Sequence, residues 1–248
     1  FRSDDDEVIN EEESADDGTD DDGNANDDEF PHRDLDEYLE WVHGYYSDLR
    51  FEPHHADTLR NHLTRDLLKE SLTLGCDYMA ANQKEAGNFR YQYDFVKQQS
   101  DPDDSPVRQA GALWGMTLCF QAMPHNTLYR TAVEKGMLFF QDHTVNGPIP
   151  GSHMIEYPDF DESQSGVNAL YGLSLVDYLR TIRDNGLAES TTSANLSEEN
   201  LRLQLDRSIR FLRYMQNDDL HFSEEYYFET EEKSEDSSPY YDGETLRS

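Results

Sequence analysis

Apolar residues recur along most of this chain at the spacing of an α-helix, and they do so in two different ways. Three segments, at 57–82, 127–143 and 198–217, carry them on only one side of the predicted helix. Two others, at 107–122 and 166–184, are apolar or small on nearly every side, which is typical of a helix that is buried all round. One-sided and all-apolar helices therefore alternate, and this alternation predicts an outer and an inner layer.

An internal repeat supports this arrangement. The segment Ala112–Leu118 (ALWGMTL) reappears as Ala169–Leu175 (ALYGLSL), with every position identical or physically similar. A second set of matches, at one constant offset, pairs Phe89 with Phe222, Phe95 with Phe228, Pro106 with Pro239 and Leu113 with Leu246. The matches indicate units that each contain an outer helix, an aromatic loop, a proline and an inner helix. Such units bury their apolar faces by stacking on copies of themselves.

The predicted fold class is all-α, with tandem α-hairpins, short β-hairpin loops, and strands only near 88–95 and 220–229. We expect residues 34–248 to form this domain. Its last inner helix begins near Asp242 and stops at Ser248, well short of the length of its repeat partner. We therefore expect the domain to be truncated at its C-terminus.

Residues 1–33 form a separate segment, which is dominated by Asp and Glu and is almost without apolar side chains. Such a segment cannot bury enough surface to offset its conformational entropy. We therefore predict a disordered acidic tail. It serves either as a solubilising arm or as an interaction tail for a basic partner or divalent cations.

The charge of the chain limits its partners. The formal net charge is −33, and we expect no nucleic-acid partner because few basic side chains are available to neutralise phosphates. An anionic membrane surface is disfavoured for the same reason, and no apolar run approaches the roughly 20 residues of a spanning helix. The acidic, Lys-poor composition suits a high-salt, marine or secretory setting, but it leaves the compartment and the oligomeric state open.

Motifs for metals, cofactors and disulfides are sparse. Cys76 and Cys119 both lie inside helical patterns, and we expect two small buried thiols rather than a disulfide or a zinc site. The histidines lack metal-ligand spacing, and the chain has no glycine-rich phosphate loop and no nucleophile elbow. We therefore expect neither a metal nor a cofactor. Asn195-Leu196-Ser197 is an N-glycosylation sequon in a loop rich in Ser and Thr.

Four segments carry a recurring hairpin signature. They are GNFRYQYDF (87–95), SPVRQAGALWGMTL (105–118), SGVNALYGLSLVDYL (165–179) and SPYYDGETL (238–246). These segments resemble the signatures of the α/α-toroid superfamily, also called six-hairpin glycosidase-like. The resemblance covers about residues 57–248 and implies the N-terminal half of a toroid. That superfamily includes glycoside hydrolases, polysaccharide lyases and sugar epimerases, so the resemblance implies carbohydrate chemistry without choosing a reaction.

In a toroid the aromatic loops run into the N-termini of the inner helices, at the mouth of a central funnel, and we expect the site there. The candidate catalytic carboxylates are Glu244, Asp94 and Glu156. The candidate substrate-binding residues are Tyr91, Tyr93, Arg108, Asn168, Tyr240, Tyr241 and Asp242. We expect one concavity to be shared by Tyr93, Asp94, Arg108, Tyr240 and Glu244. Aromatic rings stack on sugars, carboxylates bind hydroxyls or transfer protons, and an Arg binds a uronate or another acid.

Several of these residues also have a purely structural interpretation. The two tyrosines of the first aromatic loop can simply pack on a short strand. Arg108 can pair with Asp94 or Asp104. Glu244 can cap the third inner helix, because a carboxylate in the first turn is stabilising. The acidic stretch at 101–104 is expected to be a solvated loop.

Three functions are compatible with this site. The one we expect is a carbohydrate-active enzyme that hydrolyses glycosidic bonds with paired carboxylates in a central funnel. Hydrolysis needs two carboxyl groups about 5–5.5 Å apart for retention, or about 6.5–9.5 Å apart for inversion. The alternatives are a sugar epimerase or polysaccharide lyase, in which Tyr or His moves a proton beside Arg108, and a non-catalytic helical-repeat scaffold. The expected ligand is a carbohydrate or another small polar substrate.

Overall fold

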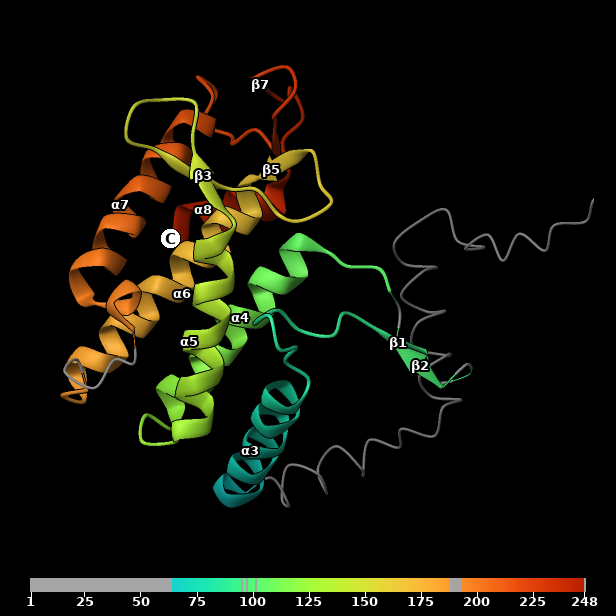
Figure 1. The fold of residues 1–248 in the computed structure, drawn as a ribbon, viewed down its shortest axis with the longest axis vertical. Coiled ribbons are helices and arrows are strands. Elements are labelled where there is room, and N and C mark those ends of the chain that lie inside the picture. The colour runs from blue at the N-terminus through green and yellow to red at the C-terminus, as the bar shows by residue number, and fades with distance from the viewer. Residues whose placement is uncertain (1–63, 95, 97, 101, 188–192, 248) are drawn as a thin grey trace, which may run out of the picture. The chain divides into compact units, whose positions relative to one another are not determined.

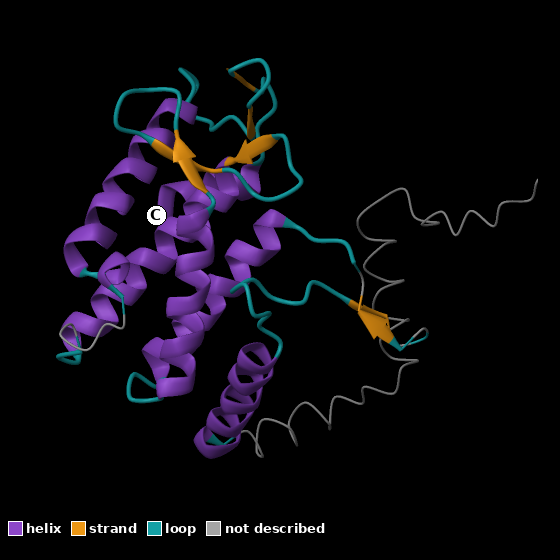
Figure 2. Cartoon of the chain, in the orientation of Figure 1, coloured by secondary structure: helices purple, strands orange, loops and turns teal. Residues whose placement is uncertain are grey.

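The computed structural model describes residues 64–247 apart from 95, 97, 101 and 188–192 (Figure 1). Three predictions fall partly or wholly outside the described residues: the acidic tail over residues 1–33, residues 34–63 of the predicted domain, and the first turns of the helix predicted at 57–82. The described part is mainly α-helical, with a few short strands (Figure 2). None of its helices is both long enough and apolar enough to cross a membrane.

Six α-helices account for most of the described residues. They are α3 (Arg65–Ala81), α4 (Pro106–Ala122), α5 (Thr127–Asp142), α6 (Ser165–Asp184), α7 (Glu198–Met215) and α8 (Pro239–Arg247). A short 3₁₀-helix, η2 (Ala194–Leu196), precedes α7. The helices predicted in this part of the chain are confirmed, with ends that differ by a few residues. The third inner helix is α8, which begins at Pro239 rather than near Asp242.

Short antiparallel strands connect the helices in three small sheets. They are β1 (Tyr93–Asp94), β2 (Gln99–Ser100), β3 (Thr144–Asn146), β4 (His153–Ile155), β5 (Glu162–Gln164), β6 (Glu225–Tyr227) and β7 (Glu232–Lys233). β1 pairs with β2, β3 pairs with β4, and β6 lies between β5 and β7. The strands predicted near 88–95 and 220–229 correspond to β1 and β6. The prediction that strands occur only there is wrong, because β3, β4 and β5 form in the loops between α5 and α6, and β2 and β7 pair with the predicted strands. The pairing of β5 with β6 ties the loop before α6 to the loop after α7.

The helices form two layers. In one layer α6 lies between α4 and α8, and α3, α5 and α7 pack against this layer (Figure 1). Residues 165–175 of α6 are all buried, so this inner helix is covered on every side. In contrast, α5 buries one face, which includes Val133, Met137 and Phe140. The predicted alternation of one-sided and fully buried helices is therefore confirmed for these two helices.

The inner helix α4 differs from its prediction. It buries one face, with Leu113, Met116 and Phe120, whereas Leu118 is exposed. α4 packs mainly against α3, α5 and α6, and within the described residues these helices do not surround it. The prediction that residues 107–122 are buried on every side is therefore wrong.

The prolines of the repeat mark the starts of inner helices. Pro106 and Pro239 are the first residues of α4 and α8. A proline is well tolerated there, because the N–H groups of the first turn have no partner within the helix. Two outer helices begin instead with side-chain caps, since Thr64 and Ser197 each accept a hydrogen bond from an N–H of the first turn of α3 and α7.

The longer repeat is also visible in the hydrogen bonds of the loops. In each unit an isolated β-bridge joins the end of the outer helix to the aromatic loop, at Phe89 and at Phe222. A first-turn side chain of the inner helix then fixes the same loop residue. Gln109 Oε1 accepts from the Phe89 N–H at 2.7 Å, and Asp242 Oδ1 accepts from the Phe222 N–H at 2.8 Å. Equivalent positions of the repeat therefore make the same hydrogen bond to the aromatic loop in both units.

The two cysteines correct one of the predictions. Cys76 of α3 and Cys119 of α4 form a disulfide, with their Cα atoms 5.8 Å apart. Both residues are buried. The prediction of two free thiols is therefore wrong. Helical periodicity shows that each cysteine lies in a helix, but it does not show that α3 and α4 meet at these two positions.

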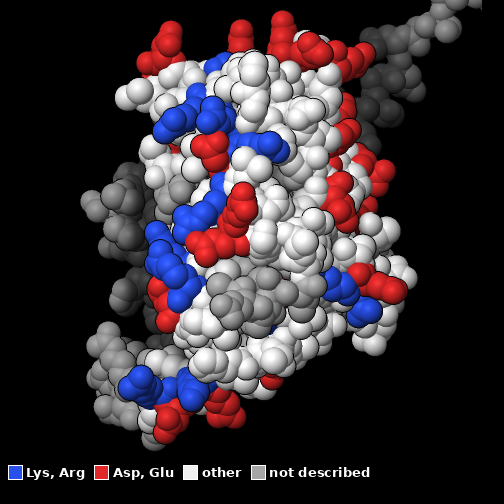
Figure 3. Space-filling model, turned by 60° about the vertical axis from the view of Figure 1, so that its left-hand side comes forward, with Lys and Arg blue, Asp and Glu red and all other residues white. Residues whose placement is uncertain are grey.

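Charged side chains of both signs lie next to one another on the face shown in Figure 3. On α7, Arg202 pairs with Glu198 and Arg210 pairs with Asp206, each one turn apart. Exposed pairs of this kind contribute only about 0.3–0.5 kcal/mol each to stability. These pairs place basic side chains among the acidic ones on α7.

Candidate functional site

A pocket of about 660 Å³ opens beside the N-terminal end of α4. Three segments form most of it: the loop after α3, the residues just before α4, and the loop between β4 and β5. The aromatic residues that line it are Tyr91, Phe139, Tyr157 and Phe160, and the charged ones are Lys84, Asp103, Asp104 and Asp159. Rings beside a few fixed polar groups are typical of pockets that bind small organic molecules.

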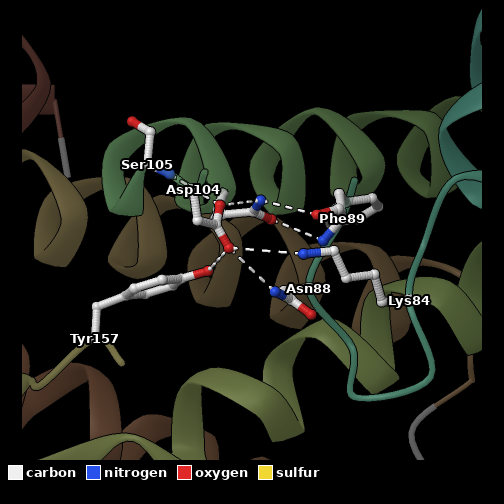
Figure 4. A network of polar contacts seen from close by, with 7 residues as sticks. Lys84, Asn88, Phe89, Asp104, Ser105 and Tyr157 are labelled. Atoms are coloured by element: carbon white, nitrogen blue, oxygen red, sulfur yellow. Dashed lines mark hydrogen bonds and ion pairs between the residues drawn. The ribbon is translucent and has the colours of Figure 1, made fainter. Parts of the chain in front are cut away.

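Asp104 lies at the centre of a polar network in this pocket (Figure 4). Its Oδ2 accepts hydrogen bonds from Tyr157 Oη at 2.9 Å and from Asn88 Nδ2 at 3.3 Å. The same oxygen lies 3.8 Å from Lys84 Nζ, so the carboxylate also forms an ion pair. One carboxylate oxygen therefore joins the three segments that form the pocket.

The other carboxylate oxygen ties the network to α4. Asp104 Oδ1 accepts from the Ser105 N–H at 2.8 Å and from Gln109 Nε2 at 2.6 Å. The Gln109 amide, which is buried, also exchanges two hydrogen bonds with the backbone of Phe89. Since both oxygens of Asp104 already accept several hydrogen bonds, this carboxylate is suited to hold its neighbours in place rather than to transfer a proton.

Tyr157 forms a rigid wall of the pocket. Its side chain is 3% exposed, and its ring centroid lies 5.7 Å from that of Phe139 and 5.9 Å from that of Phe160. Burial raises the pKa of the Tyr157 phenol, and although Asn88 acts in the opposite direction, the charge of Asp104 and the hydrogen bond to it raise the pKa further. Tyr157 therefore keeps its proton at neutral pH and donates it in the hydrogen bond to Asp104.

Tyr91 is the predicted binding residue that does line the pocket. Arg108 Nη1 donates a hydrogen bond to Tyr91 Oη at 2.9 Å, and the guanidinium carbon lies 5.3 Å from the centroid of the ring. Arg108 itself is not among the residues that line the pocket. Arg108 was expected to bind a ligand acid or to pair with Asp94 or Asp104. Its described contacts are instead with Tyr91, which it orients.

Three more predicted residues lie on β1 and at the start of the loop after β4. Tyr93 and Asp94 form β1, and Asp94 Oδ1 accepts from the Val96 N–H at 2.9 Å, within its own hairpin. Glu156 is exposed, and its backbone N–H donates to the carbonyl of His143. None of the three predicted residues lines the pocket. Tyr93 and Asp94 therefore lie outside this pocket. The concavity predicted for them together with Arg108, Tyr240 and Glu244 stays a prediction.

Asn168 has a structural role instead of the predicted role in binding. It is fully buried, and its Oδ1 accepts from the Ile155 N–H at 3.1 Å. Its Nδ2 donates to Ser163 Oγ and to the Gln164 carbonyl. The amide therefore fixes the loop before α6, as Gln109 fixes the loop before α4.

Tyr241 and Asp242 also support the fold. The Tyr241 side chain is buried, and its ring packs so closely on Gly166 that a Cβ at this glycine would overlap it. Asp242 Oδ1 accepts from the Phe222 N–H, and its Oδ2 lies 2.6 Å from His221 Nδ1. The prediction that these two side chains bind substrate is not supported by these contacts, which lie within the protein.

The last two predicted residues are on α8. Tyr240 and Glu244 belong to this helix, but their side chains lie outside the part of the structure that is described. The pairing of Glu244 with a second carboxylate therefore stays a prediction. Among the residues that the structure describes, no group of three or more His, Cys, Asp or Glu side chains could hold a metal ion.

Sequence reasoning missed the centre of this site. Asp104 was expected to belong to a solvated loop, and Lys84, Asn88 and Phe160 were not singled out. One local signal was present, because Asp104 directly precedes the Ser105-Pro106 start of an inner helix. Ser105 makes no side-chain cap, and the aspartate before it contacts the helix start through the Ser105 N–H and the Gln109 side chain.

The contact between His221 and Asp242 is expected to make stability depend on pH. The hydrogen bond to Asp242, and then the charges of Asp242 and Asp219, raise the pKa of His221. Because this folded pKa lies above the unfolded value of about 6.5, the stabilisation is complete below that value and is lost as the pH rises through the raised pKa. Partial burial acts to raise the pKa of Asp242, but the hydrogen bonds from His221 and the Phe222 N–H outweigh it and lower the pKa.

At the acid end, the contribution of Asp242 is lost only as the pH falls through its lowered pKa. The thermal unfolding midpoints of the wild type and of His221→Gln should therefore differ most near about pH 5 and converge above neutral pH. A difference that stays constant up to about pH 9 would show that the imidazolium does not stabilise the folded state.

A search with family models finds no match to this chain, and no curated protein is significantly similar to it. The function therefore has to be argued from the pocket and its chemistry.

Proposed function

We propose that the described helices form part of an α/α-toroid, and that the pocket beside Asp104 is the saccharide site of an enzyme that hydrolyses glycosidic bonds. The observation that carries the proposal is the presence, in one pocket, of aromatic rings and of a carboxylate network at the start of an inner helix. The hairpin signatures that resemble the toroid superfamily support the same class of protein.

Tyr91 is the ring that we propose stacks on the sugar. It lines the pocket, and Arg108 fixes both its hydroxyl and its ring plane. The apolar C–H face of a pyranose fits against such a ring, while its hydroxyls require hydrogen-bonding groups nearby. Lys84, Asn88 and Asp159 are the polar residues of the lining that are placed to provide them.

Hydrolysis requires a pair of carboxyl groups, and the described pocket offers Asp103 and Asp159. Asp104 is less suitable, because its oxygens are occupied by the network that holds the pocket together. Asp103 and Asp159 therefore replace Asp94 and Glu156 as the proposed reacting carboxylates. Glu244 stays a candidate for a partner acid.

The charge of the lining favours a neutral saccharide over an acidic one. Three carboxylates line the pocket, Asp103, Asp104 and Asp159, and the basic residue among the lining is Lys84, which already forms an ion pair with Asp104. An acidic sugar would meet repulsion from the lining. This reverses the expectation that Arg108 binds a uronate, since Arg108 instead contacts Tyr91.

A specific contact supports the second candidate, a sugar epimerase or polysaccharide lyase. Tyr91 lines the pocket and its phenol oxygen accepts a hydrogen bond from the Arg108 guanidinium. A tyrosine beside an arginine is suited to proton transfer next to a sugar carboxylate. A lyase requires a uronate substrate, whereas an epimerase can also act on a neutral reducing sugar. The product formed therefore separates the two proposals, since only hydrolysis adds water across the glycosidic bond.

The reaction is tested with the full chain on panels of neutral and uronate-containing oligosaccharides. Hydrolysis would release new reducing ends from a neutral glycan, and this activity should be lost in Asp103→Asn or Asp159→Asn. Formation of an unsaturated uronate, or of an epimerised sugar, would instead support the second candidate. Binding of a neutral glycan without turnover would leave a saccharide-binding scaffold and contradict the proposed hydrolase.

Replacing Tyr91 by Ala is expected to weaken binding of a neutral oligosaccharide by about tenfold or more, which corresponds to about 1.4 kcal/mol. The reason is the loss of the ring on which the sugar stacks. Isothermal titration calorimetry of the full chain measures the change. Tyr78→Ala is the matched control, because Tyr78 is an exposed tyrosine on α3 and does not line the pocket. Equal losses in the two variants would contradict a stacking role for Tyr91.

A further inference from the structure

The sequon Asn195-Leu196-Ser197 lies at the surface, in the connection between α6 and α7. Asn195 is in the 3₁₀-helix η2, and its residue is exposed. The hydrogen bonds described for it are made by its backbone. Its N–H donates to Ser193 Oγ, and its carbonyl accepts from Gln141 Nε2 and Asn200 Nδ2. The backbone is therefore fixed while the side-chain amide is presented at the surface.

The other two residues of the sequon anchor this turn to the fold. Leu196 is fully buried, and Ser197 is the N-cap of α7, with its Oγ accepting from the Asn200 N–H at 3.4 Å. A sugar attached to Asn195 would therefore extend away from a turn that is pinned on its C-terminal side. It would not displace any side-chain contact that the structure describes for this asparagine.

An independent observation concerns the compartment in which the chain folds. Cys76 and Cys119 are joined in a buried disulfide between α3 and α4. Disulfides form and persist mainly in the secretory pathway, the periplasm and the extracellular space. A sequon is used only in a protein that enters such a pathway, where it marks a surface loop. The disulfide and the exposed sequon thus require the same environment.

We propose that Asn195 carries an N-linked oligosaccharide. The co-reactant is an oligosaccharide linked to a lipid diphosphate. A bond forms between Asn195 Nδ2 and C1 of the first sugar, the bond from C1 to the phosphate oxygen breaks, the lipid diphosphate leaves, and the amide loses one proton. Modification precedes folding, because Leu196 is buried and the Ser197 hydroxyl is engaged as a helix cap in the folded chain.

The decisive sample is the full-length protein from its natural source, treated with peptide:N-glycanase in heavy-oxygen water. The peptide that contains residue 195 should then carry Asp with one heavy oxygen in place of Asn, and the intact protein should lose mass. Recovery of this peptide with unmodified Asn195 and no glycan before treatment would overturn the proposal.

Two variants distinguish the role of the sequon in glycosylation from the role of Ser197 as a helix cap. The full chain is directed through a eukaryotic secretory pathway as wild type, Asn195→Gln and Ser197→Thr. Asn195→Gln should lose the glycan and keep the cap, whereas Ser197→Thr should keep both, since threonine serves in the sequon and as an N-cap. A wild-type chain that is secreted without a glycan, or an Asn195→Gln chain that is still modified, would also overturn the proposal.

Discussion

Replacing Asp104 by Ala is expected to abolish saccharide binding and to lower the free energy of unfolding by about 3 kcal/mol. The carboxylate accepts hydrogen bonds from Tyr157 Oη, from Gln109 Nε2 and from the Ser105 N–H. Tyr157 and Gln109 are both buried, so water cannot freely replace the lost acceptor. Each buried donor left without a partner costs about 1–3 kcal/mol. Denaturant unfolding and titration calorimetry measure the two effects separately.

Two further variants test whether the loss of the Asp104 network causes these effects on binding and stability. Glu85→Ala removes an exposed carboxylate of the loop after α3 that does not line the pocket, and should leave stability and binding almost unchanged. Asp104→Asn keeps one oxygen acceptor but offers an amide donor to groups that already donate, so its loss of stability should lie between wild type and Asp104→Ala. If Asp104→Ala were as stable as wild type, the network would not hold the pocket together. If it were destabilised but still bound the saccharide, the proposed binding site would be wrong while the network stood.

The helices could be predicted because their signals are local. The stripe on α5 and the all-apolar sequence of α6 each determine which sides of a helix can face water. The proline pair Pro106 and Pro239 marks two helix starts through the geometry of proline itself. The complete burial of α4 could not be judged in this way, since it depends on how many neighbours pack around the helix.

The pocket could not be predicted because its parts come from three distant segments. The residues around Asp104 Oδ2 come from the loop after α3, the start of α4 and the loop after β4. Each is a single polar residue in a loop, without any periodicity. Residues at equivalent positions of the repeat can be found from the sequence. Two of them, Gln109 and Asp242, do not line the pocket but fix loops with their side chains. A repeat therefore revealed the residues that build the scaffold, while the candidate site lies where the repeats differ.

A buried cluster of polar side chains joins α5 to α6. Arg130 and Glu134 form an ion pair within α5, and Tyr178 of α6 contacts Glu134. Arg130 Nε donates to Glu134 Oε1 at 2.7 Å, and Tyr178 Oη donates to the same oxygen, also at 2.7 Å. Glu134 is 4% exposed and Tyr178 is fully buried. Burial raises the pKa of the Tyr178 phenol, and the hydrogen bond to Glu134 raises it further, so Tyr178 stays a donor. The Glu134 carboxylate therefore accepts hydrogen bonds from both a cation and a buried hydroxyl.

Replacing Glu134 by Ala is expected to lower the free energy of unfolding by about 3 kcal/mol, because it leaves the fully buried Tyr178 hydroxyl without its described acceptor and removes one partner of the Arg130 guanidinium. Glu134→Gln retains an oxygen that can accept a hydrogen bond from Tyr178, so its free energy of unfolding should fall less. Glu70→Ala is the control, since Glu70 is an exposed glutamate on α3. Urea unfolding of the three variants measures their free energies of unfolding and so the order of their stabilities. A Glu134→Ala protein as stable as the Glu70→Ala control would mean that the hydrogen bond between Tyr178 and Glu134 does not hold α5 against α6.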